Sequence, residues 1–127
     1  MVIGLGIDLV RIARFERAVA RHGGRFLERL FTPAEREQCR QHPFIGRQLA
    51  ARFAAKEAAF KALRTGWSQG VAWREVEIVG GGRGPSSLVF SGRARDVAGR
   101  LGIKQALVSL THDGDYALAC VIATDGN

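Results

Sequence analysis

The chain has 127 residues, the length of one domain, and its 46% of hydrophobic residues with only three prolines is typical of a globular protein and excludes a disordered one. Its 19 basic residues against 12 acidic ones leave a net charge of +7, which indicates anionic partners without identifying them. Its apolar runs are too short to span a bilayer, so we expect a cytoplasmic protein that does not bind membranes.

Residues 2–8 alternate with period two, which predicts a strand. The apolar side chains fall on one face, and Gly4, Gly6 and Asp8 fall on the other. Each glycine weakens a strand by about 0.5–1 kcal/mol relative to alanine, so another backbone, a helix or a ligand should approach closely beside Asp8. Two interpretations stay open at this point. Either a helix packs on the glycines and Asp8 merely ends the strand, or Asp8 overlooks a binding site.

An arginine-rich helix follows the strand and is expected to end near Gly23. On a helix, Arg14, Arg17 and Arg21 lie within about 60° of one another and opposite the apolar positions, so they form an exposed basic stripe. Such a stripe is a solvated face, a nucleic-acid surface or a docking surface for an acidic protein. The chain lacks the clustered aromatics, zinc framework or reader motif of a nucleic-acid-binding protein.

Two more helices are predicted between residues 32 and 66. Thr32 is a good helix cap, Pro33 suits the first helical position, and Glu35 is placed to complete a capping box. That helix should end before His42. A long helix then covers residues 45–63 and closes at residues 65–66.

The long helix carries Glu57 and Lys61 one turn apart in an alanine-rich run. Phe53 and Phe60 fall nearly on top of each other, and Glu57 lies about 40° to one side, at the rim of the face that should be buried. A carboxylate at that rim needs a partner. The two charges are either an ordinary surface ion pair, worth about 0.3–0.5 kcal/mol, or part of a site.

The second half of the chain predicts an antiparallel sheet. Period-two patterns indicate strands at residues 75–78, 87–91, 106–111 and 116–123, and an amphipathic pattern indicates a helix over residues 94–101. The turn at residues 112–115 contains Asp-Gly and joins the last two strands. The final strand is apolar on both faces, so it should be central or covered by another subunit. We therefore expect one α+β domain, with an antiparallel β-sheet packed against one long helix and shorter helices.

Three segments together resemble the holo-acyl-carrier-protein synthases, the small phosphopantetheinyl transferases. They are GIDLVRIARF at residues 6–15, RFAAKEAAFKAL at residues 52–63 and SLTHDGDYALACVI at residues 109–122. The combination of Gly-x-Asp with Phe-x-x-Lys-Glu-x-x-x-Lys is specific in a way that neither motif is alone, and the similarity spans nearly the whole chain. The resemblance implies the phosphopantetheinyl transferase fold and the transfer of 4′-phosphopantetheine from coenzyme A to a serine of an acyl carrier protein. Adenosine 3′,5′-bisphosphate would be released.

This reaction needs a nucleophilic serine, an electrophilic pyrophosphate and a means of neutralising charge on the leaving phosphate. By resemblance, Asp8 and Glu57 are the metal ligands. Two carboxylates, with pyrophosphate oxygens and water in the remaining positions, suit the coordination of Mg²⁺. The same resemblance gives three catalytic residues: Asp8, Glu57, which would help deprotonate the serine directly or through a water, and Lys61, which would stabilise phosphate charge. A simple ion pair between Lys61 and Glu57 is the alternative.

The resemblance also implies a set of coenzyme A contacts. His112, in the motif Thr-His, would lie near the 3′-phosphate, and the turn at Gly84-Pro85 would lie beside the adenine. This turn carries one glycine more than the usual Gly-Lys/Arg-Pro of the family, and Glu75 stands where aspartate is commoner. The remaining candidates for phosphate contact are Arg52, Lys61, Thr65 and Gly66.

The partners implied by the resemblance are an acyl carrier protein and a second copy of the chain. Arg14, Arg21 and Arg25 would meet the acidic helix of the carrier, which belongs to fatty-acid biosynthesis or to polyketide or peptide synthesis. The family pattern implies a homotrimer with each active site between two chains, which explains a final strand that is apolar on both faces. The competing interpretation is a basic module without enzymatic activity that binds RNA or DNA.

Overall fold

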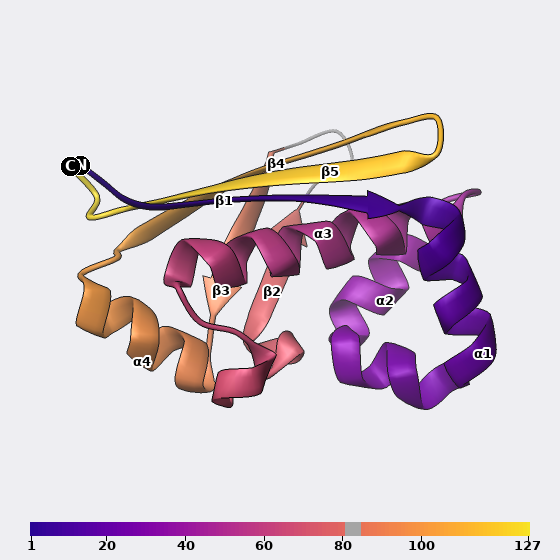
Figure 1. The fold of residues 1–127 in the computed structure, drawn as a ribbon, viewed down its shortest axis with the longest axis horizontal. Coiled ribbons are helices and arrows are strands. Elements are labelled where there is room, and N and C mark those ends of the chain that lie inside the picture. The colour runs from indigo at the N-terminus through magenta and orange to yellow at the C-terminus, as the bar shows by residue number, and fades with distance from the viewer. Residues whose placement is uncertain (81–84) are drawn as a thin grey trace.

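A computed structural model describes residues 1–80 and 85–127, and it shows the expected α+β fold (Figure 1). The five strands form one antiparallel sheet in the order β1-β5-β4-β3-β2. In chain order the elements are β1 (Val2–Arg11), α1 (Ile12–Leu30), α2 (Pro33–Arg40), α3 (Ile45–Leu63), the 3₁₀ turns η1 (Trp67–Gln69) and η2 (Trp73–Glu75), β2 (Val76–Gly80), β3 (Ser86–Phe90), α4 (Gly92–Leu101), β4 (Gln105–Asp113) and β5 (Tyr116–Thr124). None of the helices in the described residues combines the length and the apolar character needed to cross a bilayer.

The glycines of β1 allow this strand to lie directly on α3. A Cβ atom on Gly6 would stand 1.7 Å from the carbonyl oxygen of Ala58, and one on Gly4 would stand 2.2 Å from that of Ala62. Both distances are far below van der Waals contact, so only glycine permits the approach. The close neighbour expected beside these glycines is therefore a helix, and β1 continues three residues beyond the predicted end, to Arg11.

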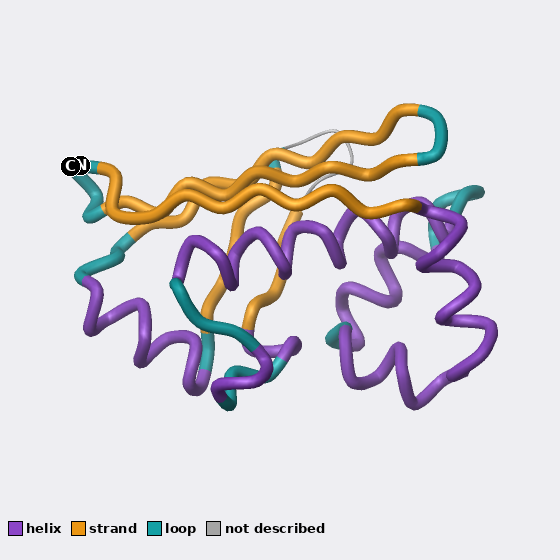
Figure 2. Tube along the Cα trace, in the orientation of Figure 1, coloured by secondary structure: helices purple, strands orange, loops and turns teal. Residues whose placement is uncertain are grey.

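The prediction that the basic helix stops near Gly23 is confirmed, but a second helical segment that was not predicted follows the stop within α1. Gly23 does leave the helical conformation, with φ 73° and ψ −155°, but the helix resumes after it and runs to the buried Leu30. Figure 2 shows the result as a sharp corner between two helical segments. The physical reason is that Phe26, Leu27 and Leu30 continue the apolar pattern after the glycine and pack on the core around Phe15.

The helices α2 and α3 match the predicted bounds, and a buried ion pair joins them. Thr32 and Glu35 form the expected capping box, in which Glu35 N–H donates to Thr32 Oγ1 over 3.2 Å. Glu35 also accepts a hydrogen bond of 2.9 Å from the Nζ of Lys56 on α3, and both side chains are completely buried. Lys56 further donates to the carbonyl oxygens of Trp73 and Val76. This network ties α2 and α3 to the start of β2.

The hairpin of β4 and β5 is longer than its sequence pattern suggested. His112 was expected in the turn, but its pairing with Ala117, and that of Asp113 with Tyr116, continue the strand ladder and leave only Gly114 and Asp115 in the turn. The pairing places His112 on the face of the sheet that meets α3, because Ala117 is buried there. β5 lies between β1 and β4, which confirms a central position for the final strand.

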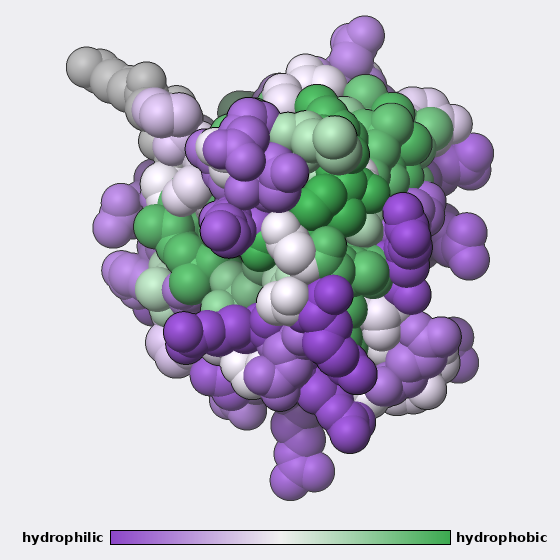
Figure 3. All heavy atoms as spheres, turned by 90° about the vertical axis from the view of Figure 1, so that its left-hand side faces the viewer, coloured by the Kyte–Doolittle hydropathy of each residue, from purple (hydrophilic) through white to green (hydrophobic). Residues whose placement is uncertain are grey.

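Among the described residues, no helix lies on the opposite face of the sheet. In Figures 1 and 2 the helices lie on one side of β1, β5 and β4 and leave the other side bare. Its large apolar side chains are half exposed or more: Val2, Leu5, Ile7, Leu9 and Leu107. Figure 3, viewed from the end where both termini lie, shows apolar residues exposed over a broad area that polar side chains surround only in part. A large exposed apolar patch is unusual on a monomeric protein.

Candidate active site

Asp8 and Glu57 line the same cleft, although 49 residues of chain separate them. The cleft holds about 560 Å³ and lies between the C-terminal half of β1, the start of α1 and the middle of α3. Gly6 positions Asp8 there, because its close contact with Ala58 sets β1 against the helical turn that carries Glu57. Phe15 and Phe53 form the apolar side of the cleft, with their ring centroids 5.1 Å apart.

Burial makes both carboxylates harder to ionise. Desolvation raises the pKa of Asp8 above its ordinary value, and the nearby Lys61 offsets part of this rise. The pKa of Glu57 is raised first by burial and then by the negative charge of Asp8, with a partial offset from Lys61. The two acids are thus close enough to repel each other, and the cleft has negative charge that a bound cation would neutralise.

Lys61 pairs with Asp8 and not with Glu57. Its Nζ atom lies 3.2 Å from Asp8 Oδ1 and donates a hydrogen bond of 2.8 Å to the carbonyl oxygen of Ile7. The simple Glu57–Lys61 ion pair that the helical spacing allowed does not occur among the ion pairs of the described residues. The lysine instead bridges from α3 to the edge strand β1.

The donor chemistry of the cleft fits a hard divalent cation. Asp8 and Glu57 supply carboxylate oxygens, and within residues 1–80 and 85–127 no group of three or more histidine, cysteine, aspartate or glutamate side chains gathers at one point. A pair of carboxylates leaves most coordination positions to water or substrate, which is how Mg²⁺ is usually held. A zinc site would need three or four protein ligands.

The basic stripe of α1 borders this cleft. Arg14 lines the cleft of Asp8 and Glu57 and also a neighbouring hollow on α1, to which Arg17 and Arg21 contribute. Ile12 and Phe15 are buried and these arginines are exposed, as the sequence pattern predicted. Arg25 is exposed too, but it lies beyond the corner at Gly23.

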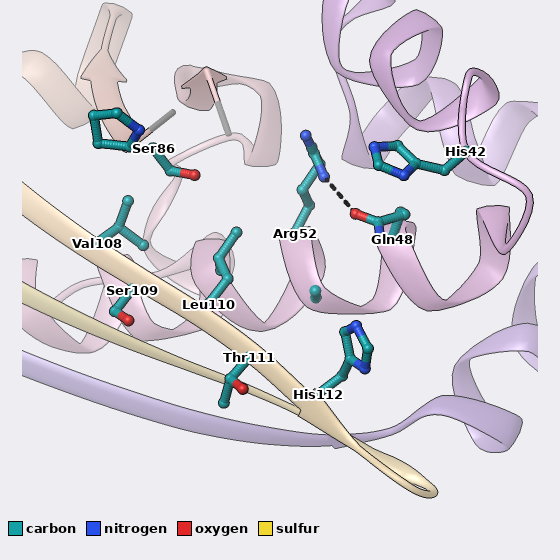
Figure 4. A pocket seen from close by; sticks show the side chains of 11 residues that line it. His42, Gln48, Arg52, Ser86, Val108, Ser109, Leu110, Thr111 and His112 are labelled. Atoms are coloured by element: carbon teal, nitrogen blue, oxygen red, sulfur yellow. Dashed lines mark hydrogen bonds between the residues drawn. The ribbon is translucent and has the colours of Figure 1, made fainter. Parts of the chain in front are cut away.

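A second cavity lies on the other side of α3, against β4, and has a volume of about 430 Å³ (Figure 4). Three residues singled out from the sequence line it: Arg52 from α3, Pro85 before β3 and His112 from β4. Gly84, the other half of the expected adenine turn, lies outside the described residues. The sequence motif did not single out His42 and Gln48, which line the same cavity. Of these two, only Gln48 had a signal in the sequence, because it lies four residues before Arg52 on the same helix.

Arg52 is a charged group buried without a matching charge. It is 3% exposed, and it makes no ion pair with any described residue. Its NH1 atom donates to Gln48 Oε1 over a long 3.5 Å, and its Nε atom has no hydrogen-bond partner. Burying a guanidinium in this way is costly, so the cavity is prepared for an anion.

Thr65 and Gly66 lie apart from both cavities, in the turn that follows α3. Thr65 N–H donates to the carbonyl oxygen of Phe60, and the carbonyl oxygen of Gly66 accepts from Gln69 N–H over 3.0 Å. The residue before them, Arg64, ends the helix in the left-handed conformation with φ 58°. This turn follows Lys61 by one helical turn, on the side of α3 that faces β1.

The helix α3 therefore divides the sequence-selected residues into two sets within one chain. Asp8, Glu57 and Lys61 lie on the side of β1, and Arg52 and His112 lie on the side of β4. The positions within the sheet agree with this division, because Val10 and His112 both pair with Ala117 of β5 and so flank that strand from opposite sides. A ligand in one set cannot reach the other through the helix.

Comparison with known proteins gives a consistent family. The model of the 4′-phosphopantetheinyl transferase superfamily matches residues 4–121. The holo-[acyl-carrier-protein] synthase of Desulforudis audaxviator is 51% identical over 123 residues, covering 97% of this chain and 93% of its own. That of Halorhodospira halophila is 46% identical over 126 residues, covering 99% and 100%.

Solved structures agree with the sequence comparison. The crystal structure of holo-[acyl-carrier-protein] synthase from Neisseria meningitidis aligns with a TM-score of 0.86 and 33% identity, over 98% of this chain and 99% of that one. The Helicobacter pylori protein of the same name, solved in complex with coenzyme A, aligns with a TM-score of 0.82 and 30% identity, over 94% and 99%.

Proposed function

The chain belongs to the holo-[acyl-carrier-protein] synthases of the 4′-phosphopantetheinyl transferase superfamily, and on this premise we propose that it transfers 4′-phosphopantetheine from coenzyme A to a serine of an apo acyl carrier protein. One observation carries the proposal. Asp8 and Glu57, remote in sequence, share a cleft with Arg14 and retain negative charge that Lys61 offsets only in part. Two such acids without further protein ligands suit a metal ion bound together with a phosphate substrate.

Asp8 and Glu57 would hold Mg²⁺. These two carboxylates would place on the pyrophosphate a cation that neutralises its charge and, as a Lewis acid, polarises its phosphoryl oxygens. Glu57 would take the proton of the carrier serine, directly or through a water. The serine oxygen would then form a bond to the phosphorus of the phosphopantetheine arm as the bond to the bridging oxygen breaks. The leaving group is adenosine 3′,5′-bisphosphate, which keeps the electron pair.

Lys61 would stabilise the phosphate charge during this step. Its Nζ atom already neutralises Asp8 and is 56% exposed, so it can reach a ligand from its present position. With Asp8 serving as a metal ligand, Lys61 would be free to contact phosphate oxygens. Thr65 and Gly66, one turn further along the chain, would extend the same phosphate-binding segment.

We propose further that the active site is completed by a second chain in a homotrimer. Within one chain α3 separates the metal-binding acids from Arg52, His112 and Pro85, which would hold the 3′-phosphate and the adenine of coenzyme A. The bare face of the sheet exposes apolar side chains from β1, β4 and β5. Packing these faces around an axis would cover them and bring the Arg52 side of one chain against the Asp8 side of the next.

The carrier protein would dock on the basic stripe of α1. Arg14, Arg21 and Arg25 are exposed and match an acidic helix, and Arg14 connects this surface to the cleft of Asp8 and Glu57. A carrier held there would present its serine to the metal site. The pathway served would be fatty-acid biosynthesis in the cytoplasm.

Mass spectrometry of apo acyl carrier protein tests the activity. Incubation with the enzyme, coenzyme A and Mg²⁺ should add one phosphopantetheine, and Asp8→Ala or chelation of the metal should prevent the addition. A wild-type protein that adds no mass to any carrier would defeat the proposal. A gel-shift series with RNA and DNA run beside it distinguishes a nucleic-acid-binding module, which would bind both tightly with a steep salt dependence and would tolerate Glu57→Gln.

A further inference from the structure

His42 lies in the turn between α2 and α3 and faces the cavity of Arg52. We infer that His42 is a third phosphate-binding residue, beside Arg52 and His112, and that it makes the enzyme select coenzyme A over ligands that lack the 3′-phosphate. This inference rests on the proposed function. Neither the motifs of the sequence nor the family resemblance assigns His42 a role.

The three basic groups reach the cavity from separate elements. In Figure 4 the ring of His42 points toward the guanidinium of Arg52, which rises from α3, and His112 enters the same cavity from β4. His42 is half-buried, and its backbone N–H donates to the carbonyl oxygen of Cys39 over 3.1 Å, which holds the turn in place. Among the described residues its imidazole has no hydrogen-bond partner, so both ring nitrogens remain available to a ligand.

The charge of the cavity selects an anion with more than one negative charge. Arg52 is buried with its Nε atom unpaired, and no aspartate or glutamate of the described residues lines the cavity. A guanidinium with two imidazole N–H groups offers donors from three directions. A phosphate monoester fits this arrangement best, because it carries a charge of about −1.5 to −2 near neutral pH and has three strong acceptor oxygens. Each phosphate of a diester pyrophosphate has fewer free oxygens and carries only one charge.

Coenzyme A contains one such monoester, the 3′-phosphate of its ribose. The cavity, at about 430 Å³, is larger than a phosphate group needs, and Ser86 lies across it from His42 in Figure 4. Pro85 also lines it. The cavity therefore has space for the ribose as well as its phosphate. Gln48 holds the guanidinium of Arg52 from the side of α3 and serves as a positioning residue for it.

Isothermal titration of coenzyme A and of 3′-dephospho-coenzyme A measures the selectivity. The wild-type enzyme should bind coenzyme A more tightly, and His42→Ala should lower that preference about tenfold by weakening coenzyme A alone, as expected for one hydrogen bond to a charged group. His42→Gln, which keeps an N–H donor of similar reach, should retain part of the preference. The exposed neighbour Gln41→Ala is the matched control and should leave both affinities unchanged.

The outcomes separate this inference from the proposed function. If His42→Ala weakens both ligands equally, or neither, while the wild type still transfers phosphopantetheine, the role of His42 is wrong and the function stands. A wild type that binds the two ligands equally well would show that the cavity is not a phosphate site. If the wild type neither binds coenzyme A nor modifies a carrier protein, both proposals fail. His42→Gln decides the question if His42→Ala does not fold, as thermal denaturation would show.

Discussion

Lys61 Nζ lies 3.2 Å from Oδ1 of Asp8, so the lysine of α3 neutralises the acid on β1. Glu57, on the same helix as the lysine, makes no ion pair with any of the described residues. A hydrogen bond of 2.8 Å to the carbonyl oxygen of Ile7 fixes the lysine against the edge strand. The arrangement places one positive charge beside two carboxylates, and the pKa of Glu57 is raised by burial and by the negative charge of Asp8.

Removing this positive charge should slow the transfer step. We expect Lys61→Met to lower kcat by about 100-fold, because one preorganised electrostatic contact to developing phosphate charge contributes this much in comparable sites. Steady-state assays with holo carrier protein as product measure it. Lys61→Arg should retain part of the activity, and Lys104→Met, at an exposed position after α4, should retain all of it. An unchanged kcat in Lys61→Met would remove the lysine from the mechanism.

Glu57→Gln should stabilise the metal-free enzyme at neutral pH. Burial and the charge of Asp8 raise the pKa of Glu57 above its unfolded value, so its protonated form favours folding, and stability is lost as the pH rises through the folded-state pKa. The melting temperature of Glu57→Gln should therefore exceed that of the wild type at pH 7, and the difference should disappear below about pH 4, where the acid is protonated in both states. Calorimetry across this range measures the effect.

Adding Mg²⁺ should reverse the order of the melting temperatures of the wild type and Glu57→Gln. The ion would bind the wild type and raise its melting temperature by mass action. It would bind Glu57→Gln weakly and change the melting temperature of that variant little. Asp96→Asn, which removes an exposed carboxylate of α4, should respond to Mg²⁺ as the wild type does. A melting temperature of the wild type that does not change with Mg²⁺, with or without coenzyme A, would contradict a metal site at Asp8 and Glu57.

Reversing one charge of the basic stripe should affect the carrier protein alone. Arg21→Glu should raise the KM for apo carrier about tenfold at low salt and leave the KM for coenzyme A unchanged, because Arg21 lies away from both cavities that coenzyme A would occupy. The defect should diminish as salt screens the charges. Arg100→Glu on α4 makes the same change of charge at a remote exposed site and should behave as the wild type. Equal effects of the two variants would contradict docking on α1.

Breaking the buried ion pair should destabilise the fold without altering the chemistry. Burial lowers the pKa of Lys56, and Glu35 holds it charged in part. Lys56→Met leaves Glu35 buried without its partner, which typically costs about 3–5 kcal/mol. Urea denaturation measures the loss. The double variant Lys56→Met with Glu35→Gln should recover part of it, because the glutamine removes the unpaired charge and its carbonyl can still accept from one of the two backbone N–H groups that bond Glu35, those of Thr32 and Ile78. A loss no larger in the single variant than in the double one would contradict the ion-pair argument.

The contact of β1 with α3 should tolerate no side chain at Gly6. Gly6→Ala would force a Cβ atom to within 1.7 Å of the carbonyl oxygen of Ala58, so the strand and helix must separate. We expect loss of both stability and metal binding, since the same contact places Asp8 beside Glu57. Gly24→Ala is the control, because a Cβ atom there meets nothing within 4 Å, and it should leave stability unchanged or raise it. Thermal denaturation of both variants distinguishes these outcomes.

The sequence by itself determined the elements whose signals are local. The bounds of α3, the capping box of Thr32 and Glu35 and the pairing of β2 with β3 follow from residues close together in the chain. The pair of glycines in β1 also indicated a close neighbour correctly. The family resemblance then selected Asp8 and Glu57, which no periodicity could have connected across 49 residues.

Only the tertiary structure decided which groups meet. Packing of β1 on α3 makes Lys61 pair with Asp8 instead of Glu57. Packing of α2 on α3 brings His42 to the cavity of Arg52. The sequence predicted the stop at Gly23 but not the second helical segment of α1, because that segment depends on burial of the apolar residues beyond Gly23 on the core. Contacts of this kind depend on the distances between elements. Those distances are set only when the apolar faces pack together, so local sequence patterns do not predict them.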